Sequence, residues 1–311
     1  MSGARPLQAH FAPRFSVLRP SGDRRQGMFQ TMVRGSVATR TALAACAALA
    51  ILAGCAGGNR EVPLENLTPE QIYLRAEAEL EANNNPEDAA TLFAEVERLY
   101  PYSDWARRAL IMQAFANHRA KAYEEARTAA QRYIDFYPAD ENAAYAQYLL
   151  ALTYYDQIDL VGRDQGLTFQ ALQALRTVIE RYPESPYARS SILKFDLAFD
   201  HLAAKEMEIG RFYLKRGHYT AALNRFRVVV EDFETTTHTA EALYRLIECY
   251  LGLGLDAEAQ TAGAILGHNF RGSDWYADGF ALLTGEGLEA EAKGDGWLRA
   301  LYRQTIRGQW L

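Results

Sequence analysis

Small and large apolar residues recur along the middle of the chain in a frame that repeats. In each copy, a small residue is followed four and seven positions later by further small or apolar residues. Offsets of four and seven lie on one face of an α-helix, so the frame predicts amphipathic helices that bury one face. The small residues are Ala89, Ala126, Ala171, Ala222 and, in a looser copy, Ala259; the later positions are Phe93, Ala130, Leu175 and Phe226, then Val96, Tyr133, Val178 and Val229.

The first three copies end at a Tyr-Pro pair. Proline cannot continue a helix and disfavours helix at the residue before it, so each pair predicts the end of one repeat and the start of the next. Glu234 and Arg271 replace the proline in the last two copies, which leaves the helix ends there open. The pairs are Tyr100-Pro101, Tyr137-Pro138 and Tyr182-Pro183.

Five such copies resemble the tetratricopeptide repeat, which consists of two antiparallel helices in about 34 residues. A single repeat does not bury its own apolar face, so stacking of neighbours forms the core. We therefore expect an all-α, right-handed solenoid of about five helix-turn-helix repeats.

The spacing of the frame is uneven. Successive small residues are 37, 45, 51 and 37 positions apart, whereas a plain repeat gives about 34. We place an insertion at 157–167, between the two helices of repeat three, because that stretch is polar and contains two glycines. Residues 187–215 contain no proline and a single glycine, Gly210, which predicts one long first helix in repeat four.

A lipoprotein signal precedes the repeats. The apolar run 41–54 follows Arg34 and Arg40 and ends in Leu52-Ala53-Gly54, directly before Cys55. A basic stretch, a short apolar stretch and small residues are typical of a secretory signal peptide. The pattern resembles the bacterial lipobox, which implies a lipid on Cys55; the alternative is a plain export signal with a chance cysteine. Ala56, where an Asp would favour the inner membrane, implies the outer membrane.

These signals divide the chain into four parts. Residues 1–54 form the predicted signal, although Met28 or Met32 is an alternative start. Residues 55–67 form a linker and 68–284 the five repeats. Residues 285–311 form a tail that is either flexible or carries a capping helix with Trp297 and Leu298 on its apolar face.

The net charge argues against nucleic acid as a partner. The segment 1–54 holds seven Arg and one Asp of the 33 basic and 39 acidic residues, so residues 55–311 carry 26 basic and 38 acidic side chains, a net charge of −12. Binding to phosphates requires a basic surface. The sequence also contains no nucleophile, phosphate-loop or metal-binding motif. We therefore expect no enzyme activity, no metal and no cofactor apart from the lipid on Cys55.

Local motifs resemble the ComL/YfiO family of outer-membrane protein assembly lipoproteins, the family of BamD. The resemblance covers about 52–283, and its more specific parts are the Arg-Asp-Gln loop and the Asn-Arg pair. The motifs are Leu67 to Tyr73, Asn85 to Ala89, Tyr100 to Ser103, Arg163-Asp164-Gln165, Arg216 to Phe226 with Asn224-Arg225, and Trp275-Tyr276.

The resemblance implies a non-enzymatic scaffold on the periplasmic face of the outer membrane. Its implied partners are the BamA barrel, other lipoproteins of the assembly complex and unfolded outer-membrane proteins. One alternative is a repeat-containing lipoprotein that serves as an adaptor of cell-wall or division machinery. A lipid-anchored hydrolase is a further alternative, against which the missing nucleophile and base argue.

Two surfaces are candidates for binding. Aromatic residues outside the packing frame, Tyr73, Trp105, Tyr145 and Tyr148, are candidates for a groove that takes an extended peptide, although core packing also explains them.

The second candidate is a basic group in repeat four, which we expect on the side that binds BamA. It comprises Arg216, Asn224, Arg225 and Arg227, with Arg211 and Lys215 nearby. Such a cluster can steer an acidic partner. The alternative is a solvated helix face on which Arg225 pairs with a neighbouring Glu.

Overall fold

The structure is a computed structural model that describes residues 62–293 and 296–305. The predicted signal sequence, Cys55 and the first part of the linker therefore lie outside the described residues. Within the described part, the regular structure consists of twelve α-helices and one short 3-10 helix at Leu64–Asn66.

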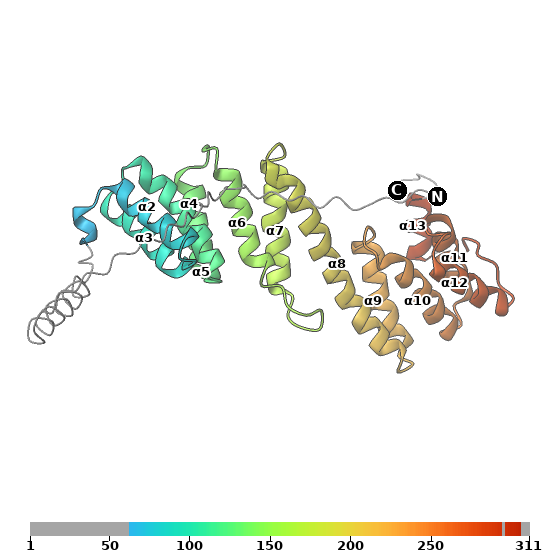
Figure 1. Cartoon of the computed structure of the whole chain (residues 1–311). Coiled ribbons are helices and arrows are strands. Elements are labelled where there is room, and N and C mark those ends of the chain that lie inside the picture. Colours follow the sequence, from blue (N-terminus) through green and yellow to red (C-terminus); the bar gives the residue numbers. More distant parts are fainter. Residues whose placement is uncertain (1–61, 294–295, 306–311) are drawn as a thin grey trace, which may run out of the picture. The chain divides into compact units, whose positions relative to one another are not determined.

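The helices form consecutive pairs, one pair for each predicted repeat, and this confirms the all-α repeat fold. From α2 to α12 each helix packs on the next along the chain, and the first helices of repeats one to four also contact one another in turn (Figure 1). The first helices are α2 (Pro69–Glu81), α4 (Asp104–Arg119), α6 (Ala143–Tyr155), α8 (Pro186–Leu214) and α10 (Thr239–Gly252). The second helices are α3 (Pro86–Leu99), α5 (Tyr123–Phe136), α7 (Gly166–Arg181), α9 (Tyr219–Asp232) and α11 (Asp256–Asn269). Helices α12 (Asp274–Gly285) and α13 (Trp297–Thr305) follow the fifth pair.

The repeated frame forms the core. The small residue of all five copies is fully buried, and the residues four and seven positions later are buried as well. In the looser fifth copy, Gly263 takes the position that Phe93 or Phe226 holds elsewhere. A Cβ on Gly263 would collide with the side chain of Leu283 from α12. In this repeat, a side chain from α12 therefore fills the space that is filled elsewhere by a side chain of the repeat's own second helix.

Local signals set the helix ends. Thr68 and Gln71 form a reciprocal capping box at the start of α2, and the side chains of Ser103 and Ser273 accept from the backbone amides of Ala106 and Tyr276. Such caps satisfy amides that have no partner within the helix.

An aromatic residue ends the second helix of every repeat. Tyr100, Tyr137 and Tyr182 occupy this position before proline, and Phe233 and Phe270 occupy it where proline is absent. All five have similar non-helical backbone angles, with φ between −127° and −135°. Helices α9 and α11 therefore end in the same way as the others without a proline.

The predicted insertion of repeat three is a loop between Tyr155 and Gly166, so the last two residues of the predicted range already belong to α7. Gln165 of the Arg-Asp-Gln motif organises the loop. Its amide nitrogen donates to the carbonyl oxygens of Val161 at 3.2 Å and Arg163 at 3.1 Å, and its amide oxygen accepts from the Thr168 hydroxyl at 2.9 Å. The ammonium of Lys205 on α8 donates to the carbonyl of Gly162 at 2.7 Å.

Helix α8 has 29 residues, as the sequence predicts, and belongs to two neighbouring parts of the core. Phe195, in its N-terminal half, packs against the cluster of repeats two and three. Ala203 and Met207, in its C-terminal half, belong to the cluster of repeats four and five. Gly210 lies against the ring of Phe226 so closely that a Cβ would collide with it, which is why this long helix carries a glycine.

Candidate partner-binding surfaces

Tyr73 and Trp105, two of the predicted groove residues, form one aromatic contact between α2 and α4. Their ring centroids are 5.0 Å apart, and the ring of Tyr73 also lies 5.2 Å from that of Phe93. Tyr73 is only 9% exposed, whereas Trp105 is partly exposed with the guanidinium of Arg108 above its ring. This burial, with a smaller contribution from Glu77, raises the pKa of Tyr73. Trp105 is thus the more accessible member of the pair.

Tyr145 and Tyr148, the other two predicted groove residues, lie on α6 and contact Tyr187 of α8. The ring of Tyr187 is 5.2 Å from Tyr145 and stacks on Tyr148 at 5.3 Å, and the hydroxyl of Tyr148 lies 2.8 Å from that of Ser190. Burial, together with the neighbouring tyrosines, raises the pKa of Tyr145 to about 12. The four predicted residues therefore fall into two groups, each between the first helices of consecutive repeats.

Tyr187 was missed by the sequence reading, although a signal for it exists. An aromatic residue stands two positions after the serine that precedes α4, α8 and α12. These residues are Trp105, Tyr187 and Trp275. Each contacts a tyrosine of the preceding first helix, and for Trp275 that residue is Tyr244, with centroids 5.5 Å apart. The recurring Ser-x-aromatic motif thus marks the aromatic junctions between repeats.

Charged side chains bridge the two intervening junctions. Beside the α4–α6 junction, Arg107 of α4 pairs at 2.9 Å with Asp140, which lies in the turn before α6, and the hydroxyl of Tyr133 on α5 donates to the same carboxylate at 2.6 Å. Burial alone would raise the pKa of Asp140, but Tyr133, the amide of Asn142 and Arg107 outweigh it and hold that pKa below its usual value.

Between α8 and α10, the bridge is a bidentate ion pair. The guanidinium of Arg211 donates to both carboxylate oxygens of Glu241, at 2.8 and 2.7 Å, and Arg245 approaches the same carboxylate at 3.3 Å. Glu241 is buried, which by itself would raise its pKa, yet the two arginines keep that pKa below its usual value. The guanidinium of Arg211 is therefore part of the junction between repeats four and five.

Two of the predicted BamA-side residues, Arg225 and Arg227, have partners within the chain. Arg225 pairs across α8 and α9 with Glu206 at 2.9 Å, while its side chain remains 43% exposed. Arg227 pairs with Glu231 at 2.9 Å and lies over the indole ring of Trp297, 4.7 Å from its centroid. The two arginines thus contact different neighbours and do not form one basic patch.

The other two predicted residues, Arg216 and Asn224, are exposed. The guanidinium of Arg216 lies 3.5 Å from the centroid of the Phe212 ring, and Phe212 is half exposed. Lys215 is exposed beside them at the end of α8. Lys215 and Arg216 thus place accessible positive charge at the turn between α8 and α9, with Asn224 exposed on α9.

No group of three or more His, Cys, Asp or Glu side chains within the described ranges is arranged to hold a metal ion. In the same part of the chain, no helix is long and apolar enough to cross a membrane.

Comparison with known proteins identifies the family. Residues 65–265 match the family YfiO, described as "Outer membrane lipoprotein". The chain belongs to this family. A relative from Caulobacter vibrioides called "Outer membrane protein assembly factor BamD" is 46% identical over 248 residues, which are 79% of this chain and 81% of that protein. A protein of the same name from Rickettsia prowazekii is 43% identical over 195 residues, which are 63% of this chain and 78% of that protein.

The family match covers the aromatic and charged junctions of repeats one to five. It ends within α11, so α12 and α13 lie beyond it. The predicted binding residues of both surfaces fall inside the match, and Trp297, which contacts Arg227, falls outside it.

Proposed function

We propose that this chain is a lipid-anchored periplasmic scaffold of the outer-membrane β-barrel assembly complex. In this role it binds BamA and other lipoproteins of the complex and helps to deliver unfolded barrel proteins for insertion. The observation that carries the proposal is the match to the outer membrane lipoprotein family over almost the whole repeat domain, together with a relative named as an assembly factor at 46% identity. A repeat domain that presents side chains from successive helices suits such a scaffold.

The lipid anchor of the proposal rests on Cys55 and the motif before it. Stable anchoring by acyl chains takes more than one chain, which a multiply acylated cysteine would supply. Changing Cys55 to Ala should leave an unprocessed or soluble protein without unfolding the repeats. Normal cleavage of this variant, with extraction still requiring detergent, would contradict the anchor.

On the BamA side, the proposal uses the α8–α9 surface. Arg216 and Asn224 are exposed there, and the half-exposed Arg225 already holds a carboxylate, Glu206, in place. An acidic group of BamA would approach the exposed charges of Lys215 and Arg216, beside Arg225, whose guanidinium is oriented by Glu206. Such complementarity governs the association rate and the register of docking. We expect Arg227 to contribute less to BamA binding, because its guanidinium already pairs with Glu231 and lies over the ring of Trp297.

For unfolded barrel proteins, the proposal uses the first helices of repeats one to three. The partly exposed rings of Trp105, Tyr145 and Tyr148 provide apolar contacts with polar edges at two places along these helices. Rigid aromatic side chains are frequent anchors for extended peptides. Photocrosslinkers at Trp105 and Tyr148 should capture barrel-protein segments; equal capture at Glu124, on a second helix, would exclude a defined groove.

Co-purification tests the function as a whole. An affinity-tagged full-length chain from detergent-solubilised outer membranes should retain a large β-barrel protein with periplasmic domains. Retention of cell-wall or division proteins without any such β-barrel protein would contradict the proposal and favour the adaptor alternative.

A further inference from the structure

The strap, which we define as residues 288–293 and 296–305 of the C-terminal segment, lies across repeats four and five. Two side chains of α11 bind its backbone. The amide nitrogen of Gln260 donates to the carbonyl of Glu289 at 2.9 Å. The hydroxyl of Thr261 lies 2.5 Å from the carbonyl of Lys293 and accepts from the amide of the same residue at 2.9 Å. Protein surfaces that bind extended peptides likewise form hydrogen bonds with the main chain of the peptide.

The helical part of the strap, α13, is anchored by its first residues. The indole nitrogen of Trp297 donates to the hydroxyl of Tyr250 on α10 at 3.0 Å, and the guanidinium of Arg227 on α9 covers the indole ring. Leu298 is only 1% exposed. The strap therefore contacts all three of the helices α9, α10 and α11.

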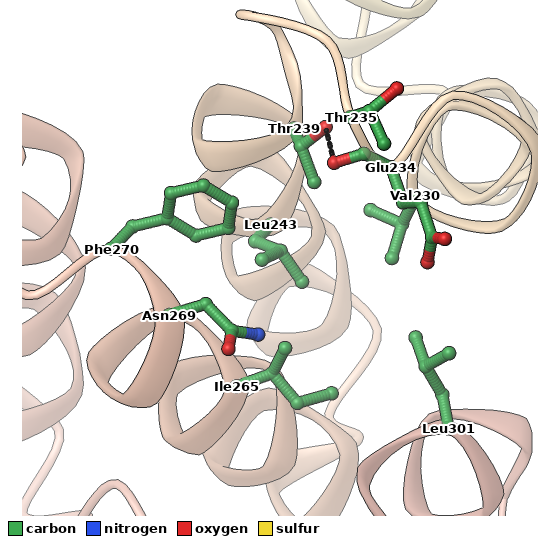
Figure 2. Close-up of a pocket in the computed structure, with 9 residues that line it drawn as sticks. All are labelled: Val230, Glu234, Thr235, Thr239, Leu243, Ile265, Asn269, Phe270 and Leu301. Carbon is green, nitrogen blue, oxygen red and sulfur yellow. Dashed lines mark hydrogen bonds between the residues drawn. The ribbon is translucent and has the colours of Figure 1, made fainter. Parts of the chain in front are cut away.

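Beyond these anchors, the surface under the strap is hollow. Leu301 of α13 faces a cavity of about 260 Å³, and apolar side chains from each helix below line its other walls (Figure 2). These are Val230 of α9, Leu243 of α10 and Ile265 of α11. Glu234, Thr235, Thr239 and Asn269 complete the lining, so the cavity has apolar walls with a polar edge. The strap thus covers this face without filling it, which indicates a groove with room for larger side chains.

The composition of the strap suits a segment that detaches. Helix α13 has only nine residues, and helices shorter than about 12 residues are marginal on their own. The sequence places glycines at 285, 287, 294 and 296, around the extended part. Segments with few buried contacts open locally at a small fraction of the free energy of global unfolding.

We propose that the face formed by α9, α10 and α11 is a docking surface for a peptide with an extended stretch followed by a short amphipathic helix, and that the strap is its built-in, releasable occupant. A partner segment with the same chemistry, a tryptophan followed by leucines on one helical face, gains access when the strap leaves. Arg225 pairs with Glu206 of α8, whereas the strap is anchored on Arg227, Tyr250, Gln260 and Thr261, so this proposal stands or falls independently of BamA docking.

Binding of a labelled peptide tests the proposal. The peptide comprises residues 286–305, and the proteins are the full-length wild type and the full-length variant W297A/L298D in detergent. The variant should bind the peptide saturably, and the wild type should bind at least tenfold more weakly because its own strap occupies the surface. The same peptide carrying both substitutions is the matched control and should not bind. Absence of binding to a variant that melts like the wild type would overturn the proposal.

Thr261→Val keeps the test decisive should the double variant unfold. It preserves side-chain volume but removes the bonds to Lys293, so hydrogen exchange in α13 should accelerate roughly fivefold to tenfold. Exchange in α10 should stay unchanged, and the labelled peptide should bind more tightly than to the wild type. Acceleration in both helices together, or in neither, would show that the strap is a fixed part of the repeat core and would overturn the proposal.

Discussion

The two ends of α8 join their neighbours by different chemistry. At its N-terminal end, between repeats three and four, Tyr187 stacks on Tyr148 and lies tilted against Tyr145. At its C-terminal end, Arg211 makes a bidentate ion pair with Glu241 of repeat five. Both junctions connect first helices of consecutive repeats. The comparison shows that the repeat frame fixes where helices stack, while the residues outside the frame decide how each junction responds to solvent conditions.

The ionic junction depends on one carboxylate. Glu241 is buried and serves both Arg211 and Arg245. Removing one member of a buried ion pair is costly because the remaining charge loses its partner. The aromatic junction is held by contacts between uncharged rings, which do not depend on an ion pair.

The largest effect should follow Glu241→Ala. The variant leaves Arg211 without its bidentate partner and Arg245 with Glu248 alone, so we expect the free energy of unfolding to fall by about 3 kcal/mol. Urea denaturation followed by the fluorescence of Trp275 and Trp297 measures it. Glu231→Ala, which breaks an exposed pair with Arg227 on a single helix, is the control and should cost less than about 0.5 kcal/mol. Equal losses would mean that Glu241 is no junction residue.

A smaller loss should follow Tyr187→Ala. The variant removes contacts with two rings from a partly exposed position, so we expect about 2 kcal/mol. Tyr187→Phe keeps the rings in contact and should stay within about 0.5 kcal/mol of the wild type in the same denaturation experiment. A Phe variant as unstable as the Ala variant would show that the hydroxyl, and not stacking, holds the junction.

Lowering the pH should weaken the two ionic junctions before the aromatic one. The pKa values of Glu241 and Asp140 are held below their usual values in the folded chain. Their stabilisation is therefore fully present above the unfolded values of about 4.3 and 3.9 and is lost as pH falls through the lower folded values. Hydrogen exchange below pH 4 should accelerate at α4–α6 and α8–α10 before α6–α8. Glu241→Gln should remove the acid response of α8–α10 only; uniform acceleration would contradict the comparison.

The smallest effect concerns Cys249, which reports on repeats four and five without altering them. Burial raises the pKa of this fully buried thiol to about 12. Alkylation at pH 8, followed at the Cys249 peptide by mass spectrometry, should be slow because the thiolate is the reactive form. The rate should rise in Glu241→Ala and remain near the wild-type rate in Tyr187→Ala. A similar rise in both variants would show that the two junctions open together.

Much of the fold could be predicted because helical spacing alone determines which residues are buried. Ala89, Ala171 and Ala222 are fully buried where the frame places them, and the long helix of repeat four has the expected length. The helix ends at Phe233 and Phe270 could not be predicted from proline, because the stop signal that all five repeats share is the aromatic residue.

The candidate surfaces were less predictable because they depend on contacts between distant residues. Nothing local to Glu241 distinguishes it from a solvated helix residue, since its partner Arg211 lies 30 positions away. The pairing of Arg225 was foreseen as an alternative, but not that Glu206 of α8 is the partner. Likewise, the strap becomes recognisable only once Trp297 is seen against Arg227 and Tyr250.

The central proposal is that repeat four binds BamA through the α8–α9 surface while repeats one to three contact unfolded barrel proteins. The most direct test compares three full-length chains in a BamA pull-down with parallel peptide crosslinking: Arg225→Glu, the swap Glu206→Arg/Arg225→Glu, and Tyr148→Ala. The account predicts that both Arg225 variants lose BamA and keep the peptide, that the swap restores stability but not BamA binding, and that Tyr148→Ala loses the peptide alone. Full BamA binding by Arg225→Glu, or joint loss of both partners in the stable swap variant, would contradict it.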